Sequence, residues 1–180
     1  MSGFSFKGVH SSKFGIYTQD QSRTLLPPKR EGKITIPGRS GYYDDVGAVY
    51  HERAASVLCS LVCPEGKTVP EVCREIAYWL SGSGRLIFDR EPDKYYLARL
   101  SGGPPMSQHL KYGEFTITWS YNPPFAFGKT ITEPLKNGEN VIDYQGTAEA
   151  PCVIVLRNTS ETDISNVTIC LLYTSPSPRD

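Results

Sequence analysis

The chain has 180 residues, and its 19 basic residues (Lys and Arg) balance its 19 acidic residues (Asp and Glu), so the formal net charge is zero. A protein built mainly to hold nucleic acid carries an excess of basic residues, and this balance argues against that class. The hydrophobic fraction of 39% and the charged fraction of 21% are typical of a folded protein and exclude a disordered chain. The 16 glycines and 14 prolines predict many turns and therefore short strands.

The N-terminal quarter is predicted to consist of short strands separated by loops. Residues 4–7 and 14–18 have the pattern of two strands around a Gly/Ser turn, and residues 34–36 (Ile-Thr-Ile) predict a third strand. Residues 25–33 contain two adjacent prolines, which cannot donate strand hydrogen bonds, so we expect a loop or an edge segment there. Residues 38–43 predict a glycine-framed loop that ends in two exposed tyrosines.

Four strands are predicted in the middle of the chain. The ranges are 54–63, 85–88, 95–100 and 114–121. The first carries apolar residues on one face, and Leu58 and Val62 predict that its other face is covered as well. The second and third are joined by a turn-forming string and predict a hairpin. The last alternates strictly between aromatic or apolar and polar residues, as a half-buried strand does.

One helix is predicted over residues 68–81. Thr68 and Glu71 have the spacing of a capping box, and the proline between them lies in the first turn, where its missing N–H does no harm. The apolar residues recur at helical spacing and form one stripe, which we expect to pack on a sheet. The stripe consists of Val69, Val72, Cys73, Ile76 and Leu80.

A domain boundary is predicted after Gly128, so that residues 1–128 form the first domain. The residues after it predict a second, all-β module without a helix, with strands at 130–132, 139–144, 152–157 and 164–171. Four strands make a poor sandwich on their own, and we therefore expect an incomplete domain over 129–173. Residues 174–180 continue no pattern and are expected to be disordered or artefactual.

The cellular location is predicted from two absent signals. The first ten residues, MSGFSFKGVH, lack the apolar stretch of a secretory signal. The longest apolar runs are far too short to span a bilayer, so no membrane partner is expected. We therefore expect a chain that is made and folded in a cytoplasm.

The cysteines and histidines predict neither a disulfide framework nor a metal site. The five cysteines are odd in number and include no CxxC pair, which is typical of buried thiols in a reducing compartment. The three histidines are scattered singly, so zinc ligation is not expected. We expect no metal and no cofactor.

No catalytic motif survives a test of spacing, so a non-enzymatic protein is expected. The segments at 66–68 and 128–130 end like phosphate-binding loops, but the required first glycine is missing from both. The segment 38–41 resembles a nucleophile elbow only superficially, because its second glycine is one place early and no helix follows. The acidic residues at 44–45 and 89–93 are expected to cap backbone groups in turns rather than to act as paired catalytic carboxylates.

The aromatic residues divide into a core set and a surface set. Trp79 and Trp119 are expected in the core, since each lies on or beside an apolar face. A second set lies in Gly- or Pro-rich loops and is a candidate contact surface. This second set consists of Tyr42, Tyr43, Phe125 and Phe127.

Three stretches together resemble the distal tail protein family of long-tailed, non-contractile phages. They are residues 26–44 (LPPKREGKITIPGRSGYYD), 74–96 (REIAYWLSGSGRLIFDREPDKYY) and 113–127 (GEFTITWSYNPPFAF). Their order and spacing fit the family, and the resemblance covers nearly all of residues 1–128. Residues 129–170 resemble the start of that family's second domain, especially at Glu133-Pro134 and in the segment APCVIV at 150–155.

The resemblance implies a structural protein of the virion at the phage tail tip. The implied fold is mainly β with one α-helix: a β-sandwich or barrel-like ring domain with the helix packed on it, followed by the start of a galectin-like β-sandwich. Copies of the chain are expected to form a hexameric ring that joins the tail tube protein to tail-tip or baseplate proteins and to receptor-binding proteins. DNA is expected only to pass through the lumen. By this resemblance the second domain is expected to be incomplete, so its receptor or carbohydrate function is not carried over to this chain.

The candidate ring interface consists of Arg39 and the four loop aromatics, Tyr42, Tyr43, Phe125 and Phe127. An alternative function, indicated by the β-rich C-terminal part and its aromatic residues, is a carbohydrate-binding β-module of a phage or bacterial surface protein. Specific binding on a glycan array would favour that alternative. A cell-wall hydrolase is a third hypothesis, and a clearing band in zymography would favour it.

Overall fold

The computed structural model describes residues 2–30, 32–45, 49–109, 112–148, 150–163 and 165–171. By its internal contacts the chain divides into two units, Met1–Asn140 and Val141–Asp180. All regular secondary structure of the described residues lies in the first unit. The domain division predicted after Gly128 stays a prediction.

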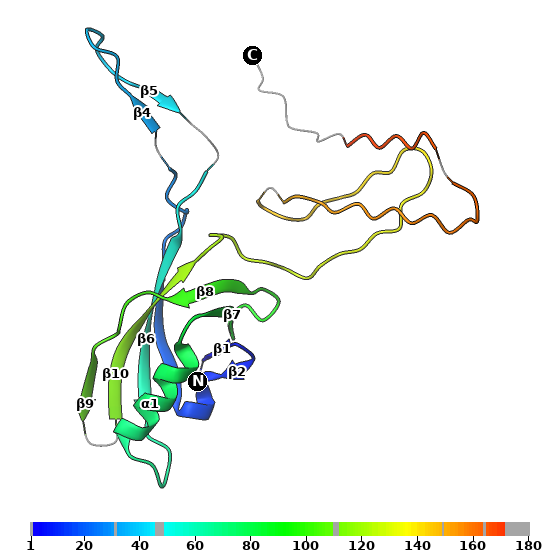
Figure 1. Cartoon of the computed structure of the whole chain (residues 1–180). Helices are drawn as coiled ribbons and strands as arrows, with labels where there is room; N and C mark the ends of the chain where they lie inside the picture. Colours follow the sequence, from blue (N-terminus) through cyan, green and yellow to red (C-terminus); the bar gives the residue numbers. More distant parts are fainter. Residues whose placement is uncertain are drawn as a thin grey trace. The chain divides into compact units, whose positions relative to one another are not determined.

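The described residues of the first unit form one large antiparallel sheet, a separate two-stranded sheet, a short 3-10 helix and an α-helix (Figure 1). In chain order the elements are β1 (Phe4–Phe6), β2 (Val9–His10), η1 (Ser11–Phe14), β3 (Ile16–Arg23), β4 (Gly32–Ile34), β5 (Tyr43–Asp45), β6 (Arg53–Val62), α1 (Val69–Leu80), β7 (Ser83–Phe88), β8 (Tyr96–Leu100), β9 (Met106–His109) and β10 (Tyr112–Tyr121). The predicted class, mainly β with a single α-helix, is confirmed.

The large sheet curls until its two edges meet. Its strand order is β2-β1-β7-β8-β10-β6-β3, and β9 pairs with β10. Ser2, just before β1, forms an antiparallel bridge with Thr18 of β3. The Thr18 amide and the Thr18 hydroxyl both donate to the Ser2 carbonyl oxygen, at 2.9 and 2.8 Å. This bridge joins β1 to β3 and gives the sheet a barrel-like form.

The longest pairing in the sheet is between β6 and β10, which run antiparallel in register from Tyr112 opposite Val62 to Tyr121 opposite Arg53. The inward face of β6 is fully buried, as its alternation predicts. The expectation that its other face is also covered is wrong: Leu58 is half-buried and Val62 is 41% exposed. The alternation of β6 thus reflects a sheet that faces the core on one side only.

Aromatic rings from several elements fill the core. The Trp119 ring of β10 lies 5.6 Å from the Phe4 ring and 4.9 Å from the Phe6 ring, both of β1. Trp79 of α1 stacks on Phe4 at 5.7 Å and on Phe14 of η1 at 4.7 Å. Both tryptophans are buried, which confirms the predicted core positions.

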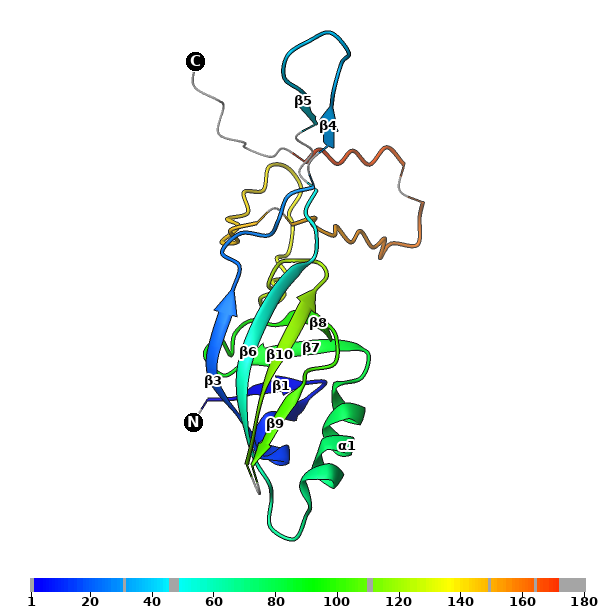
Figure 2. The same cartoon turned by 90° about the vertical axis from the view of Figure 1, so that its left-hand side faces the viewer.

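The α-helix begins with the predicted capping box and covers the core beside β1 and η1. The Thr68 amide donates to a Glu71 carboxylate oxygen at 2.9 Å, and this bond holds the pKa of Glu71 below its ordinary value. The Trp79 Nε1 atom donates to the Phe6 carbonyl oxygen at 2.9 Å and ties the helix to β1. Figure 2 shows α1 beside the strands of the sheet. The buried helix residues are Val69, Val72, Ile76, Trp79 and Leu80, and Cys73 of the predicted stripe is partly buried.

Three strands were not predicted, namely β2, β5 and β9, and one was shifted. β5 contains Tyr43, which was expected in a loop, and β9 follows a Gly/Pro segment. β4 is Gly32–Ile34 rather than residues 34–36, because it pairs with β5 through Ile34 opposite Tyr43. Neither β5 nor β9 alternates clearly, and each exists through its pairing with a neighbouring strand.

The strands predicted after Gly128 are wrong within the described residues. No strand occurs in 128–148, 150–163 or 165–171, so the predicted ranges 130–132, 139–144, 152–157 and 164–171 lack strands wherever they are described. Val153 and Val155 are 88% and 83% exposed, which shows that this apolar run packs on no layer. A strand needs a pairing partner, and these segments have none in the described part of the chain.

Removing the central ring of the core should destabilise the protein strongly. Trp119 is fully buried, so Trp119→Ala is expected to lower the free energy of unfolding by about 3–5 kcal/mol, measured by chemical denaturation. The matched control is Tyr78→Ala on α1, where the ring is 86% exposed and the expected loss is below about 0.5 kcal/mol. Equal losses for the two variants would contradict this core assignment.

Candidate interaction surface

The most exposed apolar segment of the first unit lies between β3 and β6. We call residues 24–52 the arm; it contains the two-stranded sheet of β4 and β5 (Figure 1). Its base continues the β3–β6 hairpin, because Lys29 and Tyr50 form an antiparallel bridge. The arm is therefore a long excursion from the barrel-like sheet rather than part of its core.

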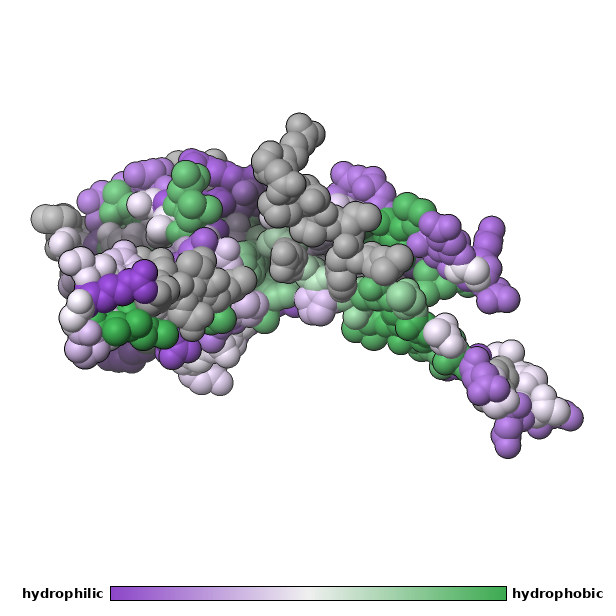
Figure 3. Space-filling model, turned by 90° about the horizontal axis from the view of Figure 1, so that it is seen from above, coloured by the Kyte–Doolittle hydropathy of each residue, from purple (hydrophilic) through white to green (hydrophobic). Residues whose placement is uncertain are grey.

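The arm exposes apolar side chains that the other described residues of the first unit leave uncovered. Leu25 is 90% exposed and Leu26 is 74% exposed, next to two prolines. The remaining exposed apolar residues of the arm are Ile34, Ile36, Tyr42 and Val49. Hydrophobic residues reach the surface among hydrophilic ones in Figure 3. Grouped exposed apolar residues mark interaction sites on soluble folds, so the arm is the main candidate for a contact surface.

The tip of the arm brings two of the predicted interface residues together. Arg39 and Tyr42 line a shallow hollow of about 90 Å³ with Ile36, Ser40 and Gly41. The Lys33 ammonium lies 5.1 Å from the centre of the Tyr42 ring. Arginine and tyrosine are enriched at protein interfaces, and a flexible cation held on a ring can be exchanged for a partner group.

The other predicted interface aromatics make contacts within the chain. Phe125 meets Tyr50, at the base of the arm, edge to face at 5.4 Å. Phe127 stacks on Tyr95 at 5.2 Å and exchanges two backbone hydrogen bonds with it, at 2.9 and 2.8 Å. Both phenylalanines are half-buried. The Tyr43 side chain lies outside the described residues.

Neither Tyr50 nor Tyr95, the two tyrosines that contact Phe125 and Phe127, was identified from the sequence as an interaction residue. The Arg85 guanidinium lies 4.4 Å from the centre of the Tyr95 ring, on which Phe127 stacks. This stack holds the segment after β10 against β7 and β8. No local sequence pattern signals it, because Phe127 lies 32 positions after Tyr95.

The acidic turn residues serve structural contacts. Asp89 accepts the Gly3 amide at 2.7 Å and contacts His10 Nε2 at 3.1 Å. Glu91 pairs with Arg23 at 2.8 Å and accepts the Tyr96 hydroxyl at 3.1 Å. Asp89 thus accepts a backbone amide, but from the segment before β1 rather than from its own turn, and Glu91 contacts side chains instead of backbone. The carboxylates of residues 44–45 lie outside the described side chains.

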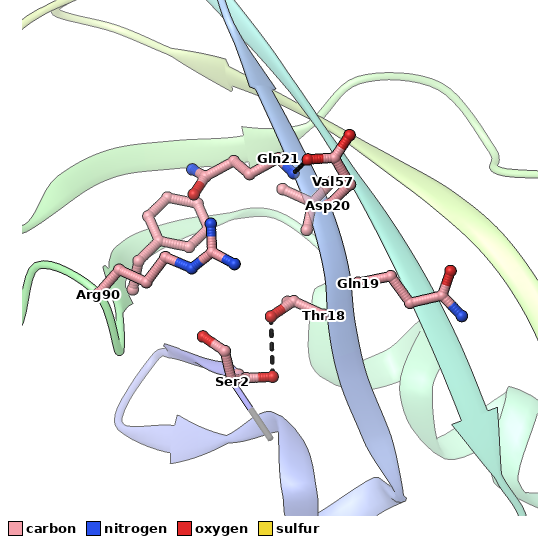
Figure 4. A pocket seen from close by; sticks show the side chains of 9 residues that line it. Ser2, Thr18, Gln19, Asp20, Gln21, Val57 and Arg90 are labelled. Atoms are coloured by element: carbon pink, nitrogen blue, oxygen red, sulfur yellow. Dashed lines mark hydrogen bonds between the residues drawn. The ribbon is translucent and has the colours of Figure 1, made fainter.

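A hollow at the seam of the sheet is too small for a substrate. It measures about 10 Å³ and lies between the Ser2–Thr18 bridge and β7. Figure 4 shows Thr18, Gln21 and Arg90 around it. That volume suits a single water molecule rather than an organic ligand. Among the described residues, no group of three or more His, Cys, Asp or Glu side chains could hold a metal ion, and no helix is long and apolar enough for a membrane span.

The cysteines differ from the expectation of uniformly buried thiols. All five are free; only Cys59 is buried, whereas Cys152 and Cys170 are exposed. Burial raises the pKa of the Cys59 thiol to about 12. Cys59 is therefore a core residue and not a nucleophile, because the thiolate is the reactive form.

Two comparisons with known proteins relate this architecture to phage tails. The family model described as the phage tail protein RIFT-related domain matches residues 9–119, more than half of the chain. The crystal structure of the SPP1 Dit (gp 19.1) protein, described as a paradigm of hub adsorption apparatus in phages infecting Gram-positive bacteria, shares the fold with a TM-score of 0.58 and 18% sequence identity. The match covers 72% of this chain and 53% of that chain, so the chain spans about half the length of the SPP1 protein. A comparison with curated protein sequences gives no match.

Thiol labelling should separate the buried cysteine from the exposed ones. At pH 8 a thiol with a pKa of about 12 is ionised in about one molecule in ten thousand, so Cys59 should resist iodoacetamide in the native protein. Cys152 and Cys170 should be alkylated readily, and all five should react after denaturation. Mass spectrometry of digested samples gives the site-specific rates. Native labelling of Cys59 at the rate of Cys152 would contradict the burial described.

Proposed function

Because the chain belongs to the family of phage tail proteins with a RIFT-related domain, we propose that it forms a hexameric ring at the tail tip. The ring joins the tail tube to tail-tip or baseplate proteins and offers an attachment point for receptor-binding proteins. The protein is a structural component of the virion, made and assembled in the cytoplasm of the bacterial host. It acts through binding and not through catalysis.

The observation that carries this proposal is the apolar arm on a barrel-like sheet. An arm that projects from one copy contacts a different surface on the next copy, which is a heterologous contact. When the rotation between copies closes, such contacts produce a ring. The exposed residues Leu25, Leu26 and Tyr42 supply the apolar area that a neighbouring copy would cover. The shared fold with the SPP1 Dit hub protein is consistent with this role.

The proposed interface keeps the five residues identified from the sequence. Arg39, Tyr42 and Tyr43 belong to the arm, where they are proposed to contact the next copy directly. Phe125 contacts Tyr50 at the base of the arm, Phe127 stacks on Tyr95, and both half-buried rings are proposed to add to the contact. DNA is proposed to pass through the lumen of the ring without a dedicated binding site.

Native mass spectrometry of the full chain over a concentration series tests the ring directly. A six-chain species that grows with concentration is expected. A protein that stays monomeric at all concentrations, alone and with a tail tube protein added, would overturn the hexameric ring. A different closed number of chains would keep self-assembly and overturn the stoichiometry.

Truncating the tyrosine at the arm tip should weaken assembly and leave the fold intact. Tyr42→Ala is expected to raise the concentration at which half of the chains are assembled by about tenfold, the effect of losing an interface anchor. The melting temperature should stay unchanged, because the Tyr42 ring is 57% exposed. Tyr78→Ala, outside the arm, serves as the control for loss of an exposed tyrosine. An equal effect of both variants on assembly would contradict the role of the arm.

A further inference from the structure

The arm meets the barrel-like sheet at a break in the hydrogen-bond ladder. The pairing of β3 with β6 ends at Arg23, and the ladder resumes where the His51 amide donates to the Pro28 carbonyl oxygen at 2.8 Å. Between these points the described residues exchange no backbone–backbone hydrogen bond, and side chains join the two strands instead. The Thr24 hydroxyl donates to the Ala54 carbonyl oxygen at 3.2 Å, and the Arg53 guanidinium donates to the Thr24 carbonyl oxygen. Prolines at positions 27 and 28 also remove two amide donors. The backbone ladder is therefore interrupted where the arm leaves the sheet, and side-chain contacts take its place.

The Glu52 carboxylate, which lies at this gap, reaches two strands of the barrel-like sheet. Glu52 Oε2 accepts the Ser120 hydroxyl of β10 at 2.5 Å and the Arg99 guanidinium of β8 at 2.9 Å. Ser120 is only 3% exposed, although its position in β10 alternates with the inward-facing residues. Glu52 therefore accepts a hydrogen bond from the buried Ser120 hydroxyl. Without the Glu52 carboxylate, this hydroxyl would lose a hydrogen-bond partner.

The electrostatic surroundings of Glu52 keep it ionised. The Ser120 hydroxyl and the Arg99 guanidinium, in that order, lower the pKa of the Glu52 carboxyl, and His51 adds a smaller effect in the same direction. A charged acceptor makes stronger hydrogen bonds than a neutral one. The contact is thus intact at neutral pH.

A contact between two aromatic side chains supports the arm at Tyr50, two residues before Glu52. Tyr50 meets Phe125 edge to face at 5.4 Å, and the segment that carries Phe125 is tied to β8 by the backbone pair of Phe127 and Tyr95. Tyr50 and Glu52 thus both reach from the arm base to parts of the chain that belong to the barrel-like sheet or are fastened to it.

We propose that Glu52, with Arg99, Ser120 and the Tyr50–Phe125 pair, forms a brace that fixes the direction of the arm before assembly. Glu52 is a positioning residue: it acts on the arm and contacts no partner itself. Holding the arm in place beforehand removes part of the ordering cost of each new contact. The lower ordering cost of assembly rests on the proposed ring. The effect of the brace on the arm of an isolated chain is independent of assembly.

Hydrogen exchange on the full chain, diluted to its monomeric state, tests the brace. Glu52→Ala should raise the exchange rate about tenfold at the arm-base amides, such as those of Arg30 and His51. The rates in α1 and in the β6–β10 pairing should stay unchanged. Glu65→Ala, an exposed carboxylate in the loop before α1, is the matched control. Unchanged rates at the arm base, or an equal rise throughout the chain, would overturn the brace.

Conservative variants of the partner distinguish the ion pair from general packing. Arg99→Lys keeps a cation near Glu52 and should leave exchange at the arm base within about twofold of the parent. Arg99→Leu removes the cation and should raise exchange as Glu52→Ala does. Equal rates for Arg99→Lys and Arg99→Leu would overturn the role of the ion pair.

Assembly of the same variants separates the brace from the proposed function. If the ring forms, Glu52→Ala should shift the half-assembly concentration upward while Tyr42 remains intact, which supports positioning. If the parent chain never assembles but Glu52→Ala loosens the arm base, the brace stands and the ring proposal fails. A ring that forms equally well with Glu52→Ala would overturn the consequence proposed for the brace.

Discussion

The packing of Trp119 between the two phenylalanines of β1 is the contact on which the rest of the fold depends. It holds the N-terminal strand against β10. Because β1 is fixed there, Ser2 lies beside Thr18 and the curled sheet joins its two edges. The Trp79 ring of α1 packs on the same two phenylalanines, so the helix is held against the same part of the core. Trp119 acts by packing alone, since its buried Nε1 has no hydrogen-bond partner within the described residues.

Because side chains fill this core, binding is expected on the surface of the protein. The barrel-like sheet is filled by side chains, and its seam hollow holds no more than a water molecule. The largest group of uncovered apolar residues in the first unit lies on the arm, which is rooted in β6 and therefore in the strand that pairs with β10. A rigid centre thus carries a projecting contact segment, and the geometry at its base decides where that segment points.

The elements that could be predicted from the sequence are those stabilised by local contacts or marked by a strong apolar periodicity. The helix, expected over 68–81 and found as Val69–Leu80, carries its own cap and apolar stripe, and β10 carries its own alternation. β5 and β9 were missed because their stability comes from pairing with distant or neighbouring strands rather than from their composition. The strands expected after Gly128 fail for the converse reason: their apolar composition suits strands, but no partner pairs with them in the described residues.

The candidate site was predictable only in part. Arg39 and Tyr42 stand out in a short glycine-framed loop, and the structure puts both at the arm tip. The contacts of Phe125 and Phe127 could not be foreseen, because Tyr50 and Tyr95 lie far away in sequence. Glu52 gave no signal either: its role depends on strands β8 and β10, which only the folded sheet brings to the base of the arm.

The central claim is that the arm of one copy binds the next copy, and photo-crosslinking tests it most directly. Benzoylphenylalanine in place of Tyr42 in the full chain, irradiated at assembling concentration, is predicted to give covalent dimers whose linked peptides join the arm to the barrel-like sheet of another copy. The same group in place of Tyr78 provides the comparison. Crosslinks from position 42 that stay within one chain, or dimers formed only from position 78, would contradict the account.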